Sequence, residues 1–339
     1  LPAAVARAGV AGAGTMGAGL APALDALGLE VIAVDLDEAS RRRASERFAA
    51  AGSSVELSDD LGRLADRDLV IDAVFEDPGV KARLFEQLEL ELAPETVIAS
   101  NTSYLDLDVL AEPLRHPERF AGLHFFNPAD RNPLVEVVRT ATASDRTIAT
   151  LGAVASRLGK TAILTGVGDG FVANRIYAAY RTQAEFLLED GASVEQVDRA
   201  MQGYGLAMGP FTVGDLSGLD IAWARRKRLA LHRDPRERVV PIPDRLCEAG
   251  RLGKKTGAGY YAYPAGARRG VHDPSVDAII AAARAERGIA PRRITDDEIV
   301  QRVLCSILSG ALAVVETGVC AAPSDVDVAM TEGFAFPRW

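Results

Sequence analysis

A glycine-rich loop close to the N-terminus restricts the folds open to this chain more than any other stretch of its sequence. Residues 5–11 form a short apolar run that predicts a strand, the loop follows, and an apolar helix is predicted after it. A second apolar run, residues 31–34, ends at Asp35. The loop itself, GAGTMG, contains Gly12, Gly14, Thr15, Met16 and Gly17. Strand, glycine loop, helix, strand and acid in this order are typical of a βαβ unit that binds a dinucleotide.

Each part of this unit has a chemical task in binding a dinucleotide. Gly12 permits the tight turn, Gly14 lets the backbone approach a pyrophosphate, and Gly17 allows the helix to pack closely on its strand. The helix N-terminus then faces the phosphates. Asp35 is expected to accept hydrogen bonds from a ribose 2′-hydroxyl and to repel a 2′-phosphate, which favours NAD over NADP. The three arginines at residues 41–43 argue for NADP, although an exposed first helical turn explains them equally well.

The first half of the chain alternates between predicted strands and predicted helices. Further strands are expected at residues 69–75, 96–100, 122–126 and 135–138, with helices at residues 39–51 and 80–92. This alternation indicates an α/β fold of Rossmann type with a doubly wound, mostly parallel sheet. After residue 168 the pattern becomes helical, so α-helical domains are expected to follow the sheet.

The last part of the chain repeats the first helical part. Matching residues recur at a constant offset of 127, with Arg175, Glu189, Gly191 and Pro210 corresponding to Arg302, Glu316, Gly318 and Pro337. Two copies of one helical unit are therefore expected, each burying an apolar face against the other. The second copy stops partway through its pattern, which predicts a fragment of a longer chain. We expect a dinucleotide-binding domain at residues 1–168, a helical substrate or dimerisation domain at 169–265, a linker at 266–293 and a truncated helical copy at 294–339.

Composition argues against several functions. With 38 basic and 47 acidic residues, the formal net charge of −9 provides no field that would attract nucleic acid or an anionic membrane. The three cysteines occur in no spacing typical of a metal site or a disulfide framework, so no metal is expected and a reducing, cytoplasmic location is predicted. Glycines interrupt the uncharged N-terminal stretch, and the uncharged residues 303–315 are fewer than the roughly 18 that a membrane span needs. We therefore expect neither a signal peptide nor a transmembrane segment.

Two polar residues stand inside apolar strands. His124 lies within GLHFFNP, and Glu136 lies twelve residues later within LVEVV. A buried unpaired carboxylate is costly, and a lone histidine in a strand is more often a core residue bonded to backbone. A pair between the two side chains removes both difficulties. A histidine with a carboxylate on one ring nitrogen and substrate at the other is the arrangement of an oriented general base.

Five motifs occur in an order that resembles the L-3-hydroxyacyl-CoA dehydrogenase family. They are GAGTMG, ASNTS at residues 99–103, LHFFNP, LVEVV and DGFVANR at residues 169–175. The resemblance extends over nearly the whole chain, and the ending GFAFPRW is similar to the C-terminal part of multifunctional fatty-acid β-oxidation enzymes. It implies NAD-dependent oxidation of (3S)-3-hydroxyacyl-CoA to 3-oxoacyl-CoA. The partners that it implies are an acyl-CoA substrate, an enoyl-CoA hydratase module on a longer chain, and a second copy in a homodimer.

The resemblance also implies roles for residues at matching positions. His124 would accept the proton of the substrate hydroxyl, and Glu136 would orient and stabilise the resulting imidazolium. Ser103 and Asn174 would hydrogen-bond the substrate oxygen, and Asn127 would lie in the same substrate cleft. The residues implied near the nicotinamide side of the cofactor are Glu76, Lys81 and Asn101.

Several of these residues also have simpler explanations. Ser103 could cap a helix, Glu76 could end a strand, and Lys81 could lie on a solvated helix face. The counterpart of Asn174 in the repeat is Gln301, and no glycine loop or His–Glu pair precedes it. The second helical unit is therefore expected to be structural rather than catalytic.

Two stretches of the sequence bear on how the acyl-CoA substrate would be bound. Residues 129–133, ADRNP, stand where the family usually has an apolar, methionine-containing loop, which affects the acyl-chain pocket. The basic run Arg225, Arg226, Lys227 and Arg228 could contact the phosphates of coenzyme A, though such runs are more often solvated helix faces.

Two other functions of the whole chain stay open. One alternative is a β-hydroxyacid dehydrogenase for free acids, which would carry a catalytic lysine in place of Asn174. The other is a catalytically silent family member with a structural or binding role.

Overall fold

The computed structural model describes residues 1–231 and 233–339, and these residues form two compact units. The first unit contains Leu1–Asn174 together with Val314–Phe334. The second contains Arg175–Ala313 together with Ala335–Trp339. The chain thus leaves the first unit after Asn174, returns to it at Val314 and leaves it again after Phe334.

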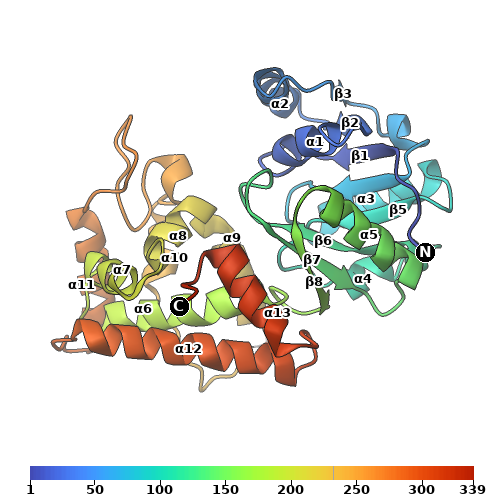
Figure 1. Cartoon of the computed structure of the whole chain (residues 1–339). Helices are drawn as coiled ribbons and strands as arrows, with labels where there is room; N and C mark the ends of the chain where they lie inside the picture. The colour runs from blue at the N-terminus through green and yellow to red at the C-terminus, as the bar shows by residue number, and fades with distance from the viewer. Residues whose placement is uncertain (232) are drawn as a thin grey trace. The chain divides into compact units, whose positions relative to one another are not determined.

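The first unit is built on one eight-stranded sheet (Figure 1). The strand order is β3-β2-β1-β4-β5-β6-β7-β8, and all neighbours are parallel except the antiparallel pair β6 and β7. This arrangement confirms the predicted Rossmann-type α/β fold. The strands are β1 (Arg7–Ala11), β2 (Glu30–Val34), β3 (Glu56–Ser58), β4 (Leu69–Asp72), β5 (Val97–Ser100), β6 (Phe120–Phe125), β7 (Leu134–Arg139) and β8 (Thr161–Gly166).

The two outermost strands were not expected from the sequence. Strand β3 has only three residues, and β8 exposes three of its six, so neither carries the continuous apolar run of a central parallel strand. Both strands lie at the ends of the strand order, so each pairs with one other strand of the sheet, β3 with β2 and β8 with β7.

Helices cover both faces of the sheet. One core contains apolar residues of α1 (Gly17–Asp25), α2 (Glu38–Ala50) and α5 (Asp145–Arg157), and the other contains those of α3 (Pro78–Glu91) and α4 (Leu107–Ala111). Short 3-10 turns occur at Leu61–Leu64 and Pro117–Arg119. The N-termini of α2, α3, α4 and α5 are capped by the side chains of Asp37, Asp77, Asp106 and Ser144. Helix α1 has no side-chain cap.

The C-terminal segment adds to the free edge of this sheet. The amide of Gly166 in β8 donates to the carbonyl oxygen of Val319 at 2.8 Å, and Thr165 forms an antiparallel bridge with Cys320. Helix α13 (Pro323–Val328) and a π-helical turn (Ala329–Gly333) follow within the same unit. Residues 294–339, expected as one helical domain, are thus divided between the two units.

The second unit is helical, as predicted for this part of the chain. The linker expected at residues 266–293 instead contains α11, whose buried residues Val276, Ile280 and Ala283 repeat at helical spacing. Its helices are α6 (Ala173–Asp190, beginning in the first unit), α7 (Val194–Tyr204), α8 (Pro210–Ser217), α9 (Leu219–Ala230), α10 (Ile242–Glu248), the 3-10 turn Lys254–Thr256, α11 (Pro274–Glu286) and α12 (Asp296–Glu316, ending in the first unit).

The two longest helices of the described residues correspond to each other in the sequence repeat. Helix α6 is matched at the constant offset by α12, and α7 is matched by the α13 region after a two-residue insertion. Gly310 of α12 packs closely against α6, because a Cβ atom there would lie 3.3 Å from the Cα of Ile176. By length and composition alone α12 could also cross a membrane, but core helices of soluble proteins pass the same test. The expected absence of a membrane span stays a prediction.

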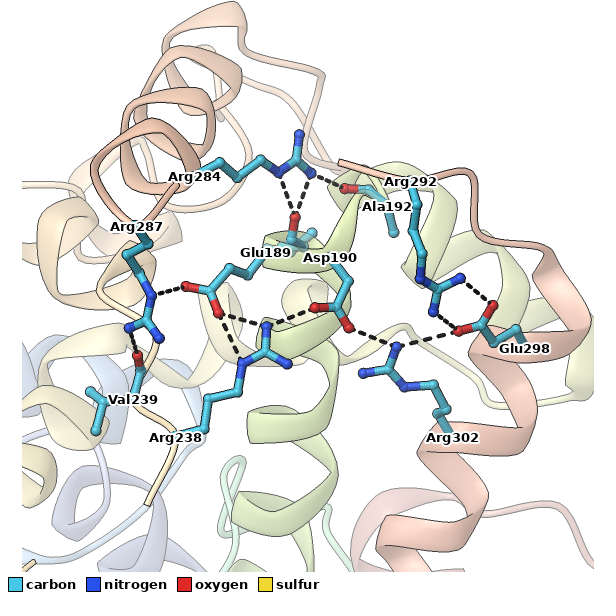
Figure 2. A network of polar contacts seen from close by, with 11 residues as sticks. Glu189, Asp190, Ala192, Arg238, Val239, Arg284, Arg287, Arg292, Glu298 and Arg302 are labelled. Atoms are coloured by element: carbon cyan, nitrogen blue, oxygen red, sulfur yellow. Dashed lines mark hydrogen bonds and ion pairs between the residues drawn. The ribbon is translucent and has the colours of Figure 1, made fainter. Parts of the chain in front are cut away.

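An ion-pair network surrounds the C-terminal end of α6 (Figure 2). Glu189 is fully buried and accepts hydrogen bonds from Arg238 at 2.6 and 2.9 Å, while its second oxygen lies 3.0 Å from Arg287. Asp190 contacts Arg238 and Arg302 at 2.7 and 2.8 Å. These pairs connect α6 with α11, α12 and the segment that follows α9.

We expect Glu189→Gln to lower the free energy of unfolding of the second unit by about 2 kcal/mol, since it leaves two arginines without their buried anion. The value is below that for a fully buried pair because Arg238 and Arg287 keep partial access to water. Urea unfolding measures it. The matched control is Glu298→Gln, which removes a more exposed partner of Arg292 and should leave the free energy of unfolding close to that of the wild type. Equal losses for the two variants would contradict the central role of Glu189.

Candidate active site

The glycine loop lies between β1 and α1, where the order of the sheet reverses. Gly12 has φ +102°, and a Cβ atom there would lie 2.6 Å from backbone atoms of Ala73. A Cβ atom on Gly17 would lie 1.8 Å from the carbonyl oxygen of Gly12, so only glycine permits this approach of helix to strand. A Cβ atom on Gly14 would meet nothing within 4 Å. The loop is therefore tight against the protein at Gly12 and Gly17 and open at Gly14.

The N-terminus of α1 is suited to an anion. Unlike the capped helices of this unit, α1 offers its first amides without a side-chain oxygen to accept from them. Thr15 and Met16 occupy the turn that leads into this helix. An uncapped helix N-terminus after a glycine loop at a switch point of the sheet is where a dinucleotide places its pyrophosphate.

Asp35 closes the other side of this loop. One carboxylate oxygen accepts from the amide of Ala13 at 2.7 Å, and the other accepts from the amide of Asp37 at 2.9 Å. The nearby arginine Arg41 is engaged elsewhere, because it donates to the carbonyl oxygens of Asp35 and Leu36. Arg43 donates to Ser40 and lies 3.8 Å from Asp37. The two arginines thus have local partners, which removes much of the argument for NADP.

Two exposed apolar side chains near this loop were missed by the sequence analysis. Leu36 follows β2 and is 73% exposed, and Phe75 follows β4 and is 76% exposed. Both stand just beyond the carboxyl ends of strands that flank β1. Other large apolar side chains of the described residues, such as Leu90, are equally exposed, so it is the position of these two beside the glycine loop that singles them out. In the sequence these two residues could have been recognised by position, because Leu36 directly follows Asp35 and Phe75 lies just after the strand that ends at Asp72.

His124 and Glu136 face each other across the antiparallel pair β6 and β7. They are opposite residues in the strand register, and the Nδ1 atom of His124 lies 2.7 Å from Oε2 of Glu136. Both side chains are buried. On the other side of the ring, Nε2 of His124 lies 3.2 Å from the hydroxyl oxygen of Ser103. The three side chains thus form one row, Ser103–His124–Glu136.

The start of α6 holds the carboxylate of this row. Oε1 of Glu136 accepts from the amides of Val172 and Ala173 at 3.1 and 2.9 Å. These amides belong to the N-terminus of the helix, where a negative charge is favoured. Phe171, which adopts φ +47°, packs its ring 5.6 Å from that of His124. Residues 171–173 lie within the motif DGFVANR, but no role had been expected for these two amides or for Phe171.

Glu76 fixes the loop that carries Ser103. One of its oxygens accepts from the hydroxyl of Thr102 at 2.6 Å and from the amides of Ser103 and Tyr104 at 2.8 and 3.0 Å. Helix α4 begins only at Leu107 and is capped by Asp106, so Ser103 is not a helix cap. Glu76 thus contacts the loop of Ser103 directly.

The ammonium group of Lys81 is buried and paired with an acidic side chain. Lys81 is 1% exposed, and its Nζ atom lies 2.7 Å from Oδ2 of Asp72. Ser100 donates to the same carboxylate oxygen at 2.6 Å. This burial contradicts the alternative of a solvated helix face. Contact of Lys81 with the cofactor stays a prediction. The sequence feature that could have predicted this ion pair is Asp72, an acidic residue at the end of the otherwise apolar strand β4.

The three asparagines implied for the site lie on different elements. Asn101 follows β5, and its side-chain oxygen accepts from the amide of Phe125 in β6 at 2.7 Å. Asn127 is exposed just after β6, next to the cis peptide bond with Pro128. Asn174 lies in the first turn of α6, directly after the amide that binds Glu136. Contact of these residues with cofactor or substrate stays a prediction.

The basic run on α9 is partly engaged within its own unit. Arg226 donates to Asp244 at 2.6 Å, and the ammonium of Lys227 lies 3.2 Å from the ring centre of Trp223. Arg225 and Arg228 also have interactions within the protein. A role in binding coenzyme A stays a prediction.

Comparison with known proteins gives this fold and site a family. Residues 7–168 match the 3-hydroxyacyl-CoA dehydrogenase, NAD binding domain, and residues 170–263 match the 3-hydroxyacyl-CoA dehydrogenase, C-terminal domain. The peroxisomal bifunctional enzyme of Danio rerio is 39% identical over 313 residues, which cover 89% of this chain and 43% of that protein. The chain thus spans less than half the length of this relative.

Solved structures agree with this assignment. The 3-hydroxybutyryl-CoA dehydrogenase of Escherichia coli has a TM-score of 0.81 at 25% identity, covering 99% of this chain and 90% of that one. The dehydrogenase part of a multifunctional enzyme from C. elegans has a TM-score of 0.70 at 27% identity, covering 99% and 80%.

A Rossmann-type domain with an NAD site and a helical second unit define an NAD-dependent dehydrogenase. The chain belongs to the 3-hydroxyacyl-CoA dehydrogenase family. The resemblance seen in the sequence is thereby confirmed, and so is NAD as the cofactor.

Proposed function

We propose that this protein interconverts (3S)-3-hydroxyacyl-CoA and 3-oxoacyl-CoA with NAD, using His124 as general base. The observation that carries the proposal is the row Ser103–His124–Glu136, with separations of 3.2 and 2.7 Å. Family membership supports the reaction class, and the row supplies the groups that the reaction needs.

The row is arranged to remove one proton. Nδ1 of His124 faces a carboxylate, so Nε2 is the atom left to accept the proton of the C3 hydroxyl. The imidazolium formed in this step is stabilised by Glu136, whose own charge is held by the α6 amides. Ser103, beside Nε2, can hydrogen-bond the substrate oxygen and hold it at the base. In the reverse direction the same imidazolium returns the proton.

The residues around the glycine loop fit the cofactor. NAD, when bound, supplies the acceptor for the hydride that leaves C3. Gly12, Gly14 and Gly17 would shape the turn around the pyrophosphate, and Asp35, bound to this loop through the amide of Ala13, would accept from the ribose hydroxyls. Leu36 and Phe75 would cover the faces of the adenine, as their exposure suggests.

We expect Asp35→Ser to raise KM for NAD about tenfold, since about 1.4 kcal/mol of hydrogen bonding to the ribose is lost. The same change should improve kcat/KM for NADP, because the repulsion of a 2′-phosphate is removed. Initial rates with both cofactors measure this preference. Arg43→Ala, on the same side of the loop, is the control and should change neither value more than twofold. An unchanged NAD-to-NADP ratio in Asp35→Ser would rule out this role for Asp35.

One assay separates the proposal from its rivals. NADH oxidation is followed with 3-oxoacyl-CoA thioesters of increasing chain length, and NAD reduction with free β-hydroxy acids. Turnover of the thioesters alone supports the proposal. Turnover of free acids alone would favour a β-hydroxyacid dehydrogenase, and no turnover of either would favour a silent family member.

The expected partners and location are part of the same proposal. The Danio rerio relative is named a bifunctional enzyme, which supports an enoyl-CoA hydratase module on a longer form of this chain. A homodimer and a cytoplasmic location stay predictions, and that relative is named peroxisomal. The mass of the native protein in solution and its distribution among cell fractions test them.

A further inference from the structure

The imidazole of His124 lies among aromatic rings, and one of them is reached by the C-terminal segment. The ring of Phe126 packs edge-on against His124, with 4.5 Å between ring centres. Phe334 packs edge-on against Phe126 in turn, at 6.0 Å and an interplanar angle of 76°. Phe334 belongs to the first unit, directly after the π-helical turn Ala329–Gly333. The second helical copy thus reaches a neighbour of the general base.

A second contact joins the same turn to the loop after β6. The side-chain amide of Asn132 donates to the carbonyl oxygen of Gly333 at 3.2 Å. Gly333 itself rests on β7, because a Cβ atom there would lie 2.7 Å from Leu134. Leu134 and Glu136 are two apart in one strand and therefore lie on the same face of it. A π-helical turn is also a feature often found at functional sites.

A lysine also binds this loop. Nζ of Lys160 donates to the carbonyl oxygens of Ala129 and Asn132 at 2.8 and 2.7 Å. The loop of residues 127–133 is therefore fixed both by Lys160 and by the turn that ends at Gly333. It immediately follows Phe126 in the chain, so its position limits where that ring can lie.

We propose that Phe334 is a positioning residue for the dehydrogenase reaction, acting on His124 through Phe126. This inference rests on the proposed function and departs from the expectation that the second helical copy is structural only. With Phe334 in place, Phe126 is confined between two rings and keeps the His124 plane aligned with Ser103 and Glu136. Without it, Phe126 can turn into the vacated space, and misalignment of a general base by about 1 Å can cost about 100-fold in rate.

The test compares Phe334→Ala with variants that refill its place. We expect kcat for 3-oxoacyl-CoA reduction to fall at least tenfold in Phe334→Ala, with KM for NADH changed less than twofold. Phe334→Tyr should recover most of the rate, because it keeps a ring against Phe126. Phe336→Ala is the matched control: its ring lies two residues further on and packs against Tyr204 in the second unit. It should keep the wild-type kcat.

A second measurement reports on the imidazole without turnover. The chain has four histidines, so the ring signal of His124 in a ¹H–¹³C spectrum is identified by its absence from His124→Ala. Phe334→Ala should shift this signal and leave those of His116 and His272 in place. A general loss of stability would not move one histidine alone. If Phe334→Ala fails to fold, Phe334→Leu takes its place in both measurements.

The two measurements keep this inference separate from the proposed function. The role of Phe334 would be overturned if the wild-type protein is active and Phe334→Ala shows neither a shifted His124 signal nor a lower kcat. A wild-type protein without dehydrogenase activity would overturn the proposed function, while the spectrum would still decide whether Phe334 positions His124. Loss of rate in Phe336→Ala equal to that in Phe334→Ala would also overturn the inference, since it would show a general effect of the C-terminal segment.

Discussion

Replacing His124 by alanine is expected to lower kcat for 3-oxoacyl-CoA reduction about 10³-fold, which lies within the usual contribution of general acid–base catalysis. The loss should appear in kcat rather than in KM for NADH, because His124 lies on β6 while the glycine loop follows β1. The substitution removes both ring nitrogens, Nδ1 facing Glu136 and Nε2 facing Ser103. Steady-state rates with acetoacetyl-CoA and NADH measure the effect.

Glu136→Gln is the companion variant and tests the orientation of the base. The glutamine oxygen can still accept from the amides of Val172 and Ala173, so the start of α6 keeps its partner. Its amide group then faces Nδ1 of His124 and cannot stabilise an imidazolium. We expect a loss of about 10²-fold in kcat. Near-wild-type turnover by either variant, with NADH affinity retained, would refute the proposed mechanism.

The parts of this molecule that could be predicted are those fixed by local chemistry. The loop needs glycine where neighbouring backbone comes too close for a Cβ atom, and the structure shows such close backbone contacts at Gly12 and Gly17. The His124–Glu136 contact could be predicted because each polar side chain needed a partner inside the sheet. The register that makes them opposite residues of β6 and β7 supplies that partner.

The parts that could not be predicted depend on how distant segments pack. Strand β8 lacks a continuous apolar run, and its parallel pairing with β7, together with the contact of Val319 and Cys320 at its end, is what defines it as a strand. The repeat predicts a second helical copy, but it does not predict that this copy divides between the units. The aromatic contact of Phe334 with Phe126 likewise joins residues more than 200 positions apart. Sequence spacing carries no information on such contacts.

The burial of Lys81 is another feature that depends on packing and was not predicted from the sequence. Among the substitutions considered, we expect that of Lys81 to lower the free energy of unfolding most. Lys81→Ala leaves Asp72 as a buried carboxylate without its cation, which should lower the free energy of unfolding by about 3 kcal/mol. We place the loss at the lower end of the usual range because Ser100 and the amide of Val74 still donate to this carboxylate.

The measurement must separate a stability role from contact with the cofactor. Urea unfolding followed by circular dichroism gives the stability, and KM for NAD is determined well below the unfolding midpoint. We expect a large shift of the midpoint and a KM within twofold of wild type, since the ammonium of Lys81 is buried. The control Arg83→Ala removes an exposed cation from the same helix and should change neither. The double variant Lys81→Met with Asp72→Asn should recover part of the lost stability, because it removes the buried charge together with its partner. An increase of KM for NAD with unchanged stability would show instead that Lys81 reaches the cofactor.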